Sequence, residues 1–317
     1  MATVSGQGTV FNLPNYTGEL FNVAPSDTPF LSAIGGLTGG KGTNTVEFEW
    51  QTEDLESTSV NNAKVEGATA PTASGVSRSN VTNVVEIHQE AIEVSYTKQA
   101  AVGLHAGINN EEINPVRDEL THQVMLKLRK VAVDVEKSFL TGVYAKPGNN
   151  ATPRTTRGIL TAITTNVFAN GGTPRAISKA IVDGALSSMY AAGSPLNQAS
   201  TVFMVGPAQK VALSNLYSTA TLNQPTQTRN IGGVAVDTLV TDFGTFGIML
   251  NRWMPADQIG ILDLGVCSPV FLAVPNKGHM FVEPLSKTGA SDKYQLYGEI
   301  GLQYGPEVYH GLIDDLS

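Results

Sequence analysis

The spacing of apolar positions changes along the chain, and each change predicts a different element. Residues 1–45 carry scattered apolar side chains between Gly, Pro, Asn and Thr, with no sustained period. Such a stretch has too little apolar surface for a core of its own, so we expect an extended arm that lies on other surfaces. The apolar anchors of this arm are Phe11, Leu13, Tyr16, Leu20, Phe21, Phe30, Leu31 and Ile34.

Two alternating segments follow the arm. Residues Val46–Trp50 and Val84–Tyr96 have the period-2 pattern of strands, and the segment between them is rich in Ser, Thr, Asn, Ala and Gly. The sequence therefore predicts a long projecting hairpin. Because a two-stranded ribbon is only marginally stable alone in water, we expect this hairpin to lie against another surface.

The next segment has helical spacing. Asn114–Pro115 resembles an N-cap followed by proline at the first helical position, and Asp118 and Glu119 then stand in the first turn, where the helix dipole favours acids. The pattern lasts until Gly142, which predicts a helix of about 28 residues, roughly 40 Å long. Its apolar stripe consists of Val116, Leu120, Val124, Leu128, Val131, Val135 and Phe139.

Residues 174–277 alternate between helical and strand patterns, which predicts a compact α/β unit. Thr173–Pro174 opens a helix that ends near Ala192, and a polar loop occupies Ser218–Asn230. Beyond this unit, Lys293–Tyr304 (KYQLYGEIGLQY) has the alternation of a long strand. The remaining predicted elements are a helix at Pro207–Leu216 and strands at Thr201–Val205, Val234–Val240, Gly247–Leu250, Ile259–Asp263 and Val270–Val274.

A glycine-rich stretch joins the arm to the hairpin. It has the G-x-x-x-x-G-K spacing of a phosphate-binding loop, with Lys41 after the second glycine. A strand follows instead of a helix, however, so the helix N-terminus that would hold a phosphate is missing. We therefore interpret the stretch as a hinge that permits a change of direction. The hinge glycines are Gly35, Gly36, Gly39, Gly40 and Gly42.

Composition narrows the class of protein. The 317 residues include 32 glycines, only 15% charged residues and 7% aromatic residues, which favours turns and extended segments over helical bundles. The formal net charge of -8 disfavours broad nucleic-acid binding. The single cysteine, Cys267, is expected to be a small buried hydrophobe. Without a basic-then-apolar leader or a membrane-length apolar run, the sequence predicts neither a secreted nor a membrane protein.

Charge is unevenly distributed between two segments. Residues 46–97 contain nine acidic and two basic side chains, a net of -7. Residues 146–179 contain five basic side chains and no acidic one, a net of +5. Segments of opposite sign indicate a contact, either within a subunit or between copies of the chain.

No motif in the sequence indicates catalysis. The five histidines lack metal-site spacing, the lone cysteine excludes a cysteine-rich zinc cage, and no nucleophile-elbow or dinucleotide-binding motif is present. The paired carboxylates Glu111–Glu112 and Asp118–Glu119 fit helix N-terminal electrostatics better than acid-base chemistry. We therefore expect no catalytic, metal or cofactor site and no enzyme. An arm, a projecting hairpin and a long helix describe instead a subunit that copies of itself complete.

The order of these parts resembles the major capsid proteins of tailed bacteriophages, in particular their SU-ten-like branch. The resemblance covers essentially the whole chain and has no active-site signature. The segments that carry it are DTPFLSAIGG (Asp27–Gly36), VEFEWQTEDL (Val46–Leu55), VTNVVEIHQEAIEVSYTKQA (Val81–Ala100), LRKVAVDVEKSFLTG (Leu128–Gly142) and YQLYGEIGLQYGPEVYHGLIDDL (Tyr294–Leu316).

The resemblance implies the Hong Kong 97-type capsid fold, an α+β fold built from an arm, a hairpin and two domains. The polar loop Ser218–Asn230 would then lie at the centre of the capsomer. The implied divisions are an N-terminal arm (1–45), an extended hairpin called the E-loop (46–97), a peripheral domain with a spine helix (98–173), an axial domain (174–277), and a return to the peripheral strands (278–317).

The resemblance also implies contacts between subunits, since E-loops in this family lie over a neighbour. We expect the hairpin acids Glu53, Asp54 and Glu56 to face Arg154 and Arg157 of an adjacent copy. Some relatives crosslink an E-loop lysine to a neighbour's asparagine. The lysine that invites comparison is Lys64, which we interpret as a solubilising charge because no signature of a buried base accompanies it.

The expected function is that of a structural protein in the virion capsid. Copies would assemble in the host cytoplasm into hexameric and pentameric capsomers of an icosahedral shell, which encloses double-stranded DNA without sequence-specific binding and involves no membrane. Scaffolding, portal and decoration proteins would be separate partners. Alternative interpretations are an encapsulin-type nanocompartment shell, a phage tail or decoration protein, and an enzyme with dispersed catalytic residues.

Overall fold

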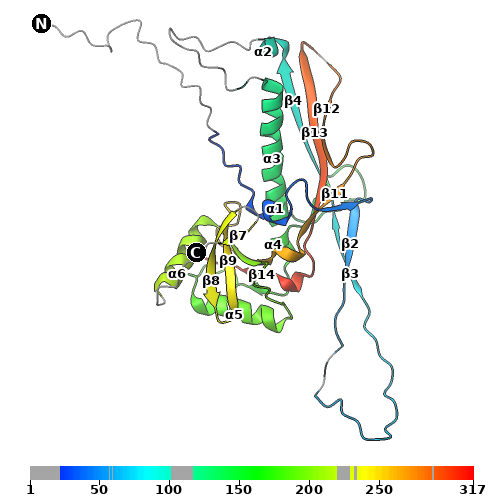
Figure 1. The fold of residues 1–317 in the computed structure, drawn as a ribbon, viewed down its shortest axis with the longest axis vertical. Coiled ribbons are helices and arrows are strands. Elements are labelled where there is room, and N and C mark those ends of the chain that lie inside the picture. Colours follow the sequence, from blue (N-terminus) through cyan, green and yellow to red (C-terminus); the bar gives the residue numbers. More distant parts are fainter. Residues whose placement is uncertain are drawn as a thin grey trace, which may run out of the picture.

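The computed structural model has a long helix beside a sheet, a hairpin that projects from one end of them, and an α/β unit beside that end (Figure 1). The structure describes residues 22–56, 58, 60–100, 116, 118–219, 229–231, 234–287 and 289–317. Arm residues 1–21, the pair Asn114–Pro115 and most of the polar loop Ser218–Asn230 lie outside this part of the chain. No helix within the described residues is long and apolar enough to cross a membrane.

Helices and strands alternate irregularly along the chain. The helices are α1 (Pro29–Ile34), α2 (Tyr96–Ala100), α3 (Glu119–Thr141), α4 (Ile159–Ala162), α5 (Lys179–Ala191) and α6 (Pro207–Thr219), with 3-10 turns at Leu264–Val266 and Glu307–Tyr309. The strands are β1 (Lys41–Thr43), β2 (Glu47–Thr52), β3 (Ser79–Val84), β4 (Glu86–Ser95), β5 (Val167–Phe168), β6 (Thr201–Val205), β7 (Arg229–Ile231), β8 (Val234–Thr241), β9 (Gly244–Leu250), β10 (Ile259–Asp263), β11 (Ser268–Leu272), β12 (Met280–Pro284), β13 (Ser291–Gln303) and β14 (Gly311–Ile313).

These strands form three sheets. In the five-stranded sheet, β13 pairs antiparallel with β4, β11 and β12, and β1 adds in parallel to β11. The seven-stranded sheet has the order β5-β14-β10-β6-β9-β8-β7 and forms the α/β unit with α5 and α6. Among the strands that the structure describes, β2 and β3 of the hairpin pair only with each other.

The long helix is confirmed, but it begins later than the sequence indicated. Helix α3 has 23 residues, and the Asp118 carboxylate caps it by accepting a hydrogen bond from the backbone N–H of Leu120 at 3.1 Å. Asp118 is therefore the N-cap and not a first-turn residue. The C-terminal half of helix α3 carries the buried side chains, including Val131, Val135 and Phe139 of the expected stripe.

The strand expected at Val84–Tyr96 is instead two strands in different sheets. Its first residue ends β3, in register with Glu47 of the hairpin, whereas β4 pairs with β13 over ten residues. The chain leaves the ladder at Val85, whose N–H donates to the backbone carbonyl of Val46 at 3.0 Å. The projecting hairpin therefore ends earlier in the sequence than the pattern predicted. Most of its expected second strand is β4, which belongs to the body of the molecule (Figure 1).

The elements of the α/β unit largely confirm the prediction, with two clear errors. The strand expected at Val270–Val274 is β11, which belongs to the five-stranded sheet and not to this unit. Helix α5 begins at Lys179 and not at Pro174, because the backbone around Arg175 is drawn into the sheet edge. The Arg175 N–H donates to the carbonyl of Asp315 at 2.9 Å, and the Ser317 N–H donates to the carbonyl of Arg175 at 3.0 Å. Pairing with a distant segment, here the isolated bridge between Arg175 and Leu316, can therefore override a proline at the first helical position.

The described residues form two hydrophobic cores. One lies between α1, α3, α4 and both large sheets and includes Phe30, Phe139 and Tyr304. The other fills the α/β unit, around Leu186 and Phe246. Cys267 is buried in the first core, as expected, and burial raises the pKa of its thiol.

Candidate functional site

The hairpin leaves the body at a point where a turn following α3 holds it. This turn, which we call the clamp, comprises residues 142–158 and is closed by an antiparallel bridge between Ala145 and Thr155. The clamp includes three of the five side chains of the basic segment, namely Lys146, Arg154 and Arg157. The sequence thus places a basic turn directly after the long helix and next to the acidic hairpin.

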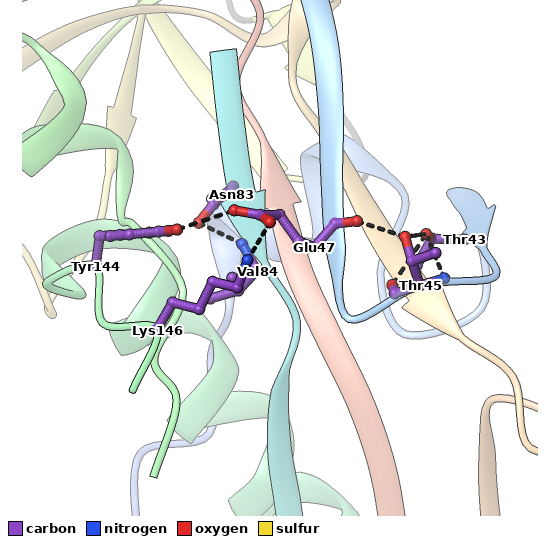
Figure 2. Close-up of polar contacts among 7 residues, drawn as sticks. All are labelled: Thr43, Thr45, Glu47, Asn83, Val84, Tyr144 and Lys146. Carbon is purple, nitrogen blue, oxygen red and sulfur yellow. Dashed lines mark hydrogen bonds and ion pairs between the residues drawn. The ribbon is translucent and has the colours of Figure 1, made fainter. Parts of the chain in front are cut away.

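Glu47, the first residue of β2, is the acidic contact of the clamp (Figure 2). Its carboxylate accepts a hydrogen bond from the Tyr144 hydroxyl at 3.3 Å and pairs with the Lys146 ammonium. The hydrogen bond from Lys146 is the main cause that lowers the pKa of Glu47, and the same bond raises the pKa of Lys146. The contact expected between the acidic and basic segments is thus confirmed within one subunit.

Two threonines fix the chain just before Glu47. The Thr45 N–H donates to Oγ1 of Thr43 at 3.2 Å, and Thr43 Oγ1 donates to the Thr45 carbonyl at 3.1 Å. The Thr45 hydroxyl in turn donates to the carbonyl of Glu47. Figure 2 shows this chain of bonds leading from the end of β1 to the start of β2. The connection between sheet and hairpin is therefore a hydrogen-bonded corner.

Asn83 in β3 is the buried polar contact of the clamp. Its Oδ1 accepts from the N–H of Arg157 at 2.8 Å and from the N–H of Val84 at 2.9 Å. Its Nδ2 donates to the carbonyl of Leu302 in β13 at 2.7 Å and to that of Arg157 at 3.2 Å. One fully buried side chain therefore joins the hairpin, the clamp and the five-stranded sheet.

A buried acid, Glu86, continues the contact along β4. The Glu86 carboxylate accepts from the N–H of Thr156 at 3.0 Å and lies 2.8 Å from Nε2 of His88. Burial acts to raise the pKa of Glu86, but hydrogen bonds and charge from His88, with bonds from Ser138 and Thr156, together lower it. The ionised form of Glu86 is thus stabilised at the clamp.

The basic side chains expected to reach a neighbour are engaged in their own subunit. Arg154 donates from Nε to the carbonyl of Val85 at 2.7 Å and pairs with the carboxylate of Glu299. Arg157 donates to the Tyr304 hydroxyl at 3.1 Å and lies 4.8 Å from the ring centroid of Tyr144. Both residues keep part of their surface exposed, so they remain accessible from outside.

The hairpin acids expected to face them lie elsewhere in the subunit. Glu53, Asp54 and Glu56 are exposed beyond the end of β2, and Glu53 pairs with Arg78 of the same hairpin at 3.3 Å. Lys64 is exposed in the projecting loop. The subunit alone therefore does not bring these acids to Arg154 and Arg157.

The glycine-rich stretch is a close-packed turn. Gly35 and Gly40 have φ values of 130° and 142°, which favour glycine. A Cβ on Gly40 would lie 2.4 Å from the Pro269 carbonyl oxygen, and one on Gly39 would lie 2.7 Å from that of Gly35. Gly36 has φ of 69°, whereas Gly42 lies in β1 with open space around it. The stretch thus fixes a change of direction through tight packing.

Sequence reasoning missed the most buried contacts of this site. No sequence pattern indicated that Asn83 is buried, because an asparagine in a polar segment is usually exposed to solvent. Glu86 and Glu47 were counted only as members of an acidic segment. The signal that pointed in the right direction was the opposite net charge of the two segments.

Comparisons with known proteins give the same kind of protein, a phage major capsid protein, over nearly the whole chain. The family model described as SU10 major capsid protein matches residues 3–317. The major capsid protein of Escherichia phage Phieco32 is 23% identical over 341 residues, which cover 92% of this chain and 90% of that protein.

Similar solved structures share the fold at low sequence identity. The cyanophage A-1(L) capsid asymmetric unit has a TM-score of 0.67 at 12% identity and covers 99% of both chains. The capsid of a native GTA particle has a TM-score of 0.61 at 14% identity and covers 100% of both. The SrpI encapsulin complex from Synechococcus elongatus PCC 7942 has a TM-score of 0.60 at 11% identity, covering 100% of this chain and 97% of that one.

Proposed function

The chain belongs to the SU10 major capsid protein family, and from this membership we propose that it builds the icosahedral shell around the double-stranded DNA of a tailed bacteriophage. It is a major capsid protein of the virion with the Hong Kong 97-type α+β fold. The observation that carries the proposal is the match of the family model to residues 3–317. Copies would form hexameric and pentameric capsomers in the host cytoplasm, with scaffolding, portal and decoration proteins as separate partners.

The structure of the hairpin supports assembly with copies of the chain. Beyond β2 and β3 the loop projects away from the body, and its apolar side chains Leu55, Val60 and Val65 are 84%, 98% and 80% exposed. Apolar groups that project in this way gain free energy when a partner covers them. We propose that a neighbouring subunit supplies that cover.

We further propose where the hairpin tip docks. A groove of about 210 Å³ lies beside the clamp, and its lining includes Val46, Ile87, Lys146 and Arg154. Leu55 stands between two acids in the sequence Asp54-Leu55-Glu56, so it offers an apolar anchor with flanking negative charge. The apolar lining of the groove would receive Leu55 of a second copy, and the basic side chains Lys146 and Arg154 would face its flanking acids Asp54 and Glu56. Arg157 lies at the adjoining end of the clamp.

A disulfide-trapping experiment tests this docking. Leu55→Cys combined with Asn149→Cys, which places a thiol in the groove, should give reducible covalent multimers in assembled particles. The native Cys267 is buried and will not compete. Leu55→Cys combined with Val211→Cys, an exposed position on α6, is the matched control. Particles that form normally without crosslinks from the first pair would refute the docking and leave the shell function intact.

The proposed domains follow the expected boundaries, with one refinement. We propose an axial domain at 174–277 and a peripheral domain at 98–173 and 278–317, because most of the α/β unit lies in the first range. The boundaries are crossed at three strands: β5 and β14 belong to the seven-stranded sheet, and β11 belongs to the five-stranded sheet. We propose that the E-loop, expected at 46–97 after an arm of 1–45, ends at Val85, because β4 is a strand of the five-stranded sheet.

We propose a structural role without catalysis. Each of the four buried acids of the described residues contacts protein groups. Glu86 contacts Thr156 and His88, Glu299 contacts Arg154, Glu136 accepts from the N–H groups of Phe30 and Leu31, and Asp263 accepts from the N–H of Gly265. Such contacts fix the conformation of the subunit, which is the task of a shell protein.

An encapsulin-type shell is the second candidate, because the SrpI encapsulin shares the fold over the whole chain. Electron microscopy of the expressed protein tests the shared part of both proposals, since closed shells differ visibly from tubes and small oligomers. The contents of native particles then separate the two: packaged DNA supports the capsid, and a packed cargo enzyme supports the encapsulin.

A further inference from the structure

One short segment carries the chain from the five-stranded sheet to the seven-stranded sheet. Strand β13 ends at Gln303 and β14 begins at Gly311, and we call the residues between them, 304–310, the crossover. Because these two strands lie in different sheets, the crossover connects the two main parts of the subunit. Its last residue, His310, is fully buried. A buried imidazole therefore stands at the passage from one part to the other.

Both ring nitrogens of His310 have a backbone partner. Nδ1 accepts a hydrogen bond from the N–H of Asp263, at the end of β10, at 3.2 Å. Nε2 donates to the carbonyl of Tyr304, at the start of the crossover, at 2.7 Å. An N–H can only donate and a carbonyl can only accept, so these partners require a proton on Nε2 and a free lone pair on Nδ1. The hydrogen bonds thus specify a neutral imidazole in one tautomer.

The start of the crossover contacts the base of the hairpin. Nε1 of Trp50 in β2 donates to the carbonyl of Gly305 at 2.9 Å. The Trp50 ring also packs edge-to-face on the ring of Tyr304, with their centroids 4.8 Å apart. The Tyr304 hydroxyl accepts from Arg157 of the clamp at 3.1 Å. The crossover therefore joins the hairpin and the clamp to the strand β10 that His310 contacts.

Several ionisable groups surround the imidazole. Burial is the main cause that lowers the pKa of His310, and the bond to Tyr304 and the charges of Asp263 and Glu307 act in the opposite direction without offsetting it. Both carboxylates accept hydrogen bonds from backbone N–H groups close to them. The Cys267 thiol, which donates to the Asp263 carbonyl at 3.4 Å, and the Tyr304 hydroxyl are the other ionisable groups beside the ring.

We propose that His310 is an acid-sensitive switch, which holds the crossover closed as a neutral imidazole and loosens it when the ring takes up a proton. A proton on Nδ1 would point at the N–H of Asp263, so two donors would face each other and the bond to β10 would be lost. The charged ring would also be buried, at a cost that opening to water removes. Because Tyr304 and Gly305 hold Trp50, an open crossover would loosen the hairpin base as well. This inference goes beyond the proposed shell function and concerns how each subunit responds to acid.

The sign of the pH dependence follows from linkage. The pKa of His310 in the closed subunit lies below the ordinary value of 6.5, so its stabilising contribution is present above pH 6.5 and is lost as the pH falls through the closed-state value. With the ordinary value in the open form and a neutral ring in the closed form, the opening constant should rise about tenfold from pH 7.5 to pH 5.5. The pKa of Glu86 in the clamp is lowered from 4.5, so this carboxylate stays ionised over the same range.

Hydrogen exchange of the full-length protein tests the proposal. The readout is the protection of the Asp263 and His310 amides at pH 7.5, 6.5 and 5.5, after correction for the intrinsic pH dependence of exchange. In the wild-type protein the protection of both amides should fall about tenfold from pH 7.5 to pH 5.5. Protection that stays constant or increases over this range would overturn the proposal without the need for any variant.

Two histidine variants assign the effect to the right group. His310→Gln cannot take up a proton, so the protection of the Asp263 amide should be lower at pH 7.5 and should no longer depend on pH. His122→Gln removes a half-buried histidine of α3, outside the crossover, and should keep the wild-type pH dependence. If His310→Gln kept this dependence, or His122→Gln lost it, another group would control the crossover and the proposal would be wrong.

Trp50 reports whether the hairpin base follows the crossover. The chain has two tryptophans, so Trp253→Phe leaves Trp50 as the single one. Quenching of its fluorescence by acrylamide should increase from pH 7.5 to pH 5.5, and His310→Gln in the same background should abolish the increase. Quenching that did not change while the amides lost protection would refute the connection between the switch and the hairpin.

Discussion

Asn83 and Arg157 are joined by hydrogen bonds in both directions, because the Asn83 amide accepts from the Arg157 N–H at 2.8 Å and donates to the Arg157 carbonyl at 3.2 Å. The pair connects the inner end of the hairpin to the clamp. A buried amide therefore fixes the position from which the hairpin projects, together with the Glu47–Lys146 ion pair at the start of β2.

Replacement of Asn83 by alanine should destabilise the subunit. The substitution removes four hydrogen bonds and leaves buried backbone groups of Arg157 and Leu302 without that partner, which predicts a loss of about 2–4 kcal/mol in the free energy of unfolding. Denaturant unfolding measures the effect. Asn80→Ala in the same strand is the control, since Asn80 is exposed and bonds to Glu49 on the surface of the hairpin. Equal effects of the two substitutions would contradict the role of Asn83.

Exchange of the charges of Glu47 and Lys146 tests the ion pair at the hairpin base. Lys146→Glu alone places two acids together and should weaken the protection of β2 amides in hydrogen exchange. The double variant Glu47→Lys with Lys146→Glu restores opposite charges and should recover much of that protection. Protection that falls as far in the double variant as in the single one would mean that the pair does not hold the hairpin.

Acid should weaken the clamp. The folded-state pKa of Glu86 is lowered from 4.5, so its stabilising contribution is present above pH 4.5 and is lost as the pH falls through the folded-state value. We expect the protection of the Thr156 amide to decrease below pH 4.5 in the wild-type protein, and to be low and less pH-dependent in Glu86→Gln. A clamp that tightens in acid would refute this assignment.

Reversal of charge in the hairpin tests its contact with a neighbour separately from folding. Asp54→Lys with Glu56→Lys should leave the unfolding of the isolated subunit unchanged, because both side chains are exposed. The same variant should reduce the yield of particles. Arg154→Glu with Arg157→Glu should instead impair both subunit stability and assembly, because these arginines also bond to Val85 and Tyr304. Normal particles from both variants would exclude the expected pairing.

Valine at Gly40 should destabilise the turn between arm and hairpin, because its Cβ would meet the Pro269 carbonyl oxygen and the backbone has a positive φ. We expect a loss of about 2–4 kcal/mol in unfolding free energy and fewer particles. Alanine at Gly42, which has open space around it, is the matched control and should change stability by less than about 1 kcal/mol. If shells assembled and expanded normally with Gly40→Val, the predicted hinge would have no role in assembly.

The parts that the sequence predicted well have local causes. The apolar stripe of α3 and the alternation of β13 each lie within one continuous segment, so their periods can be read directly. The opposite charges of the hairpin and the clamp also predicted a contact that Glu47 and Lys146 make within one subunit.

The parts that the sequence could not predict depend on distant segments. Asn83 gains its role only because Arg157 and Leu302, separated from it by 74 and 219 positions, meet at its side chain. Glu136 similarly belongs to a long helix whose pattern shows no reason for a buried acid. The division of Val84–Tyr96 into two strands follows from the pairing of β4 with β13, which no local period reveals.

The most direct test of the central claim is a cryo-electron microscopy reconstruction of particles formed by the expressed protein. We expect closed icosahedral shells in which each hairpin lies on a neighbouring subunit, with Leu55 near the clamp of that neighbour. Small discrete oligomers, or shells in which the hairpin contacts only its own subunit, would contradict it.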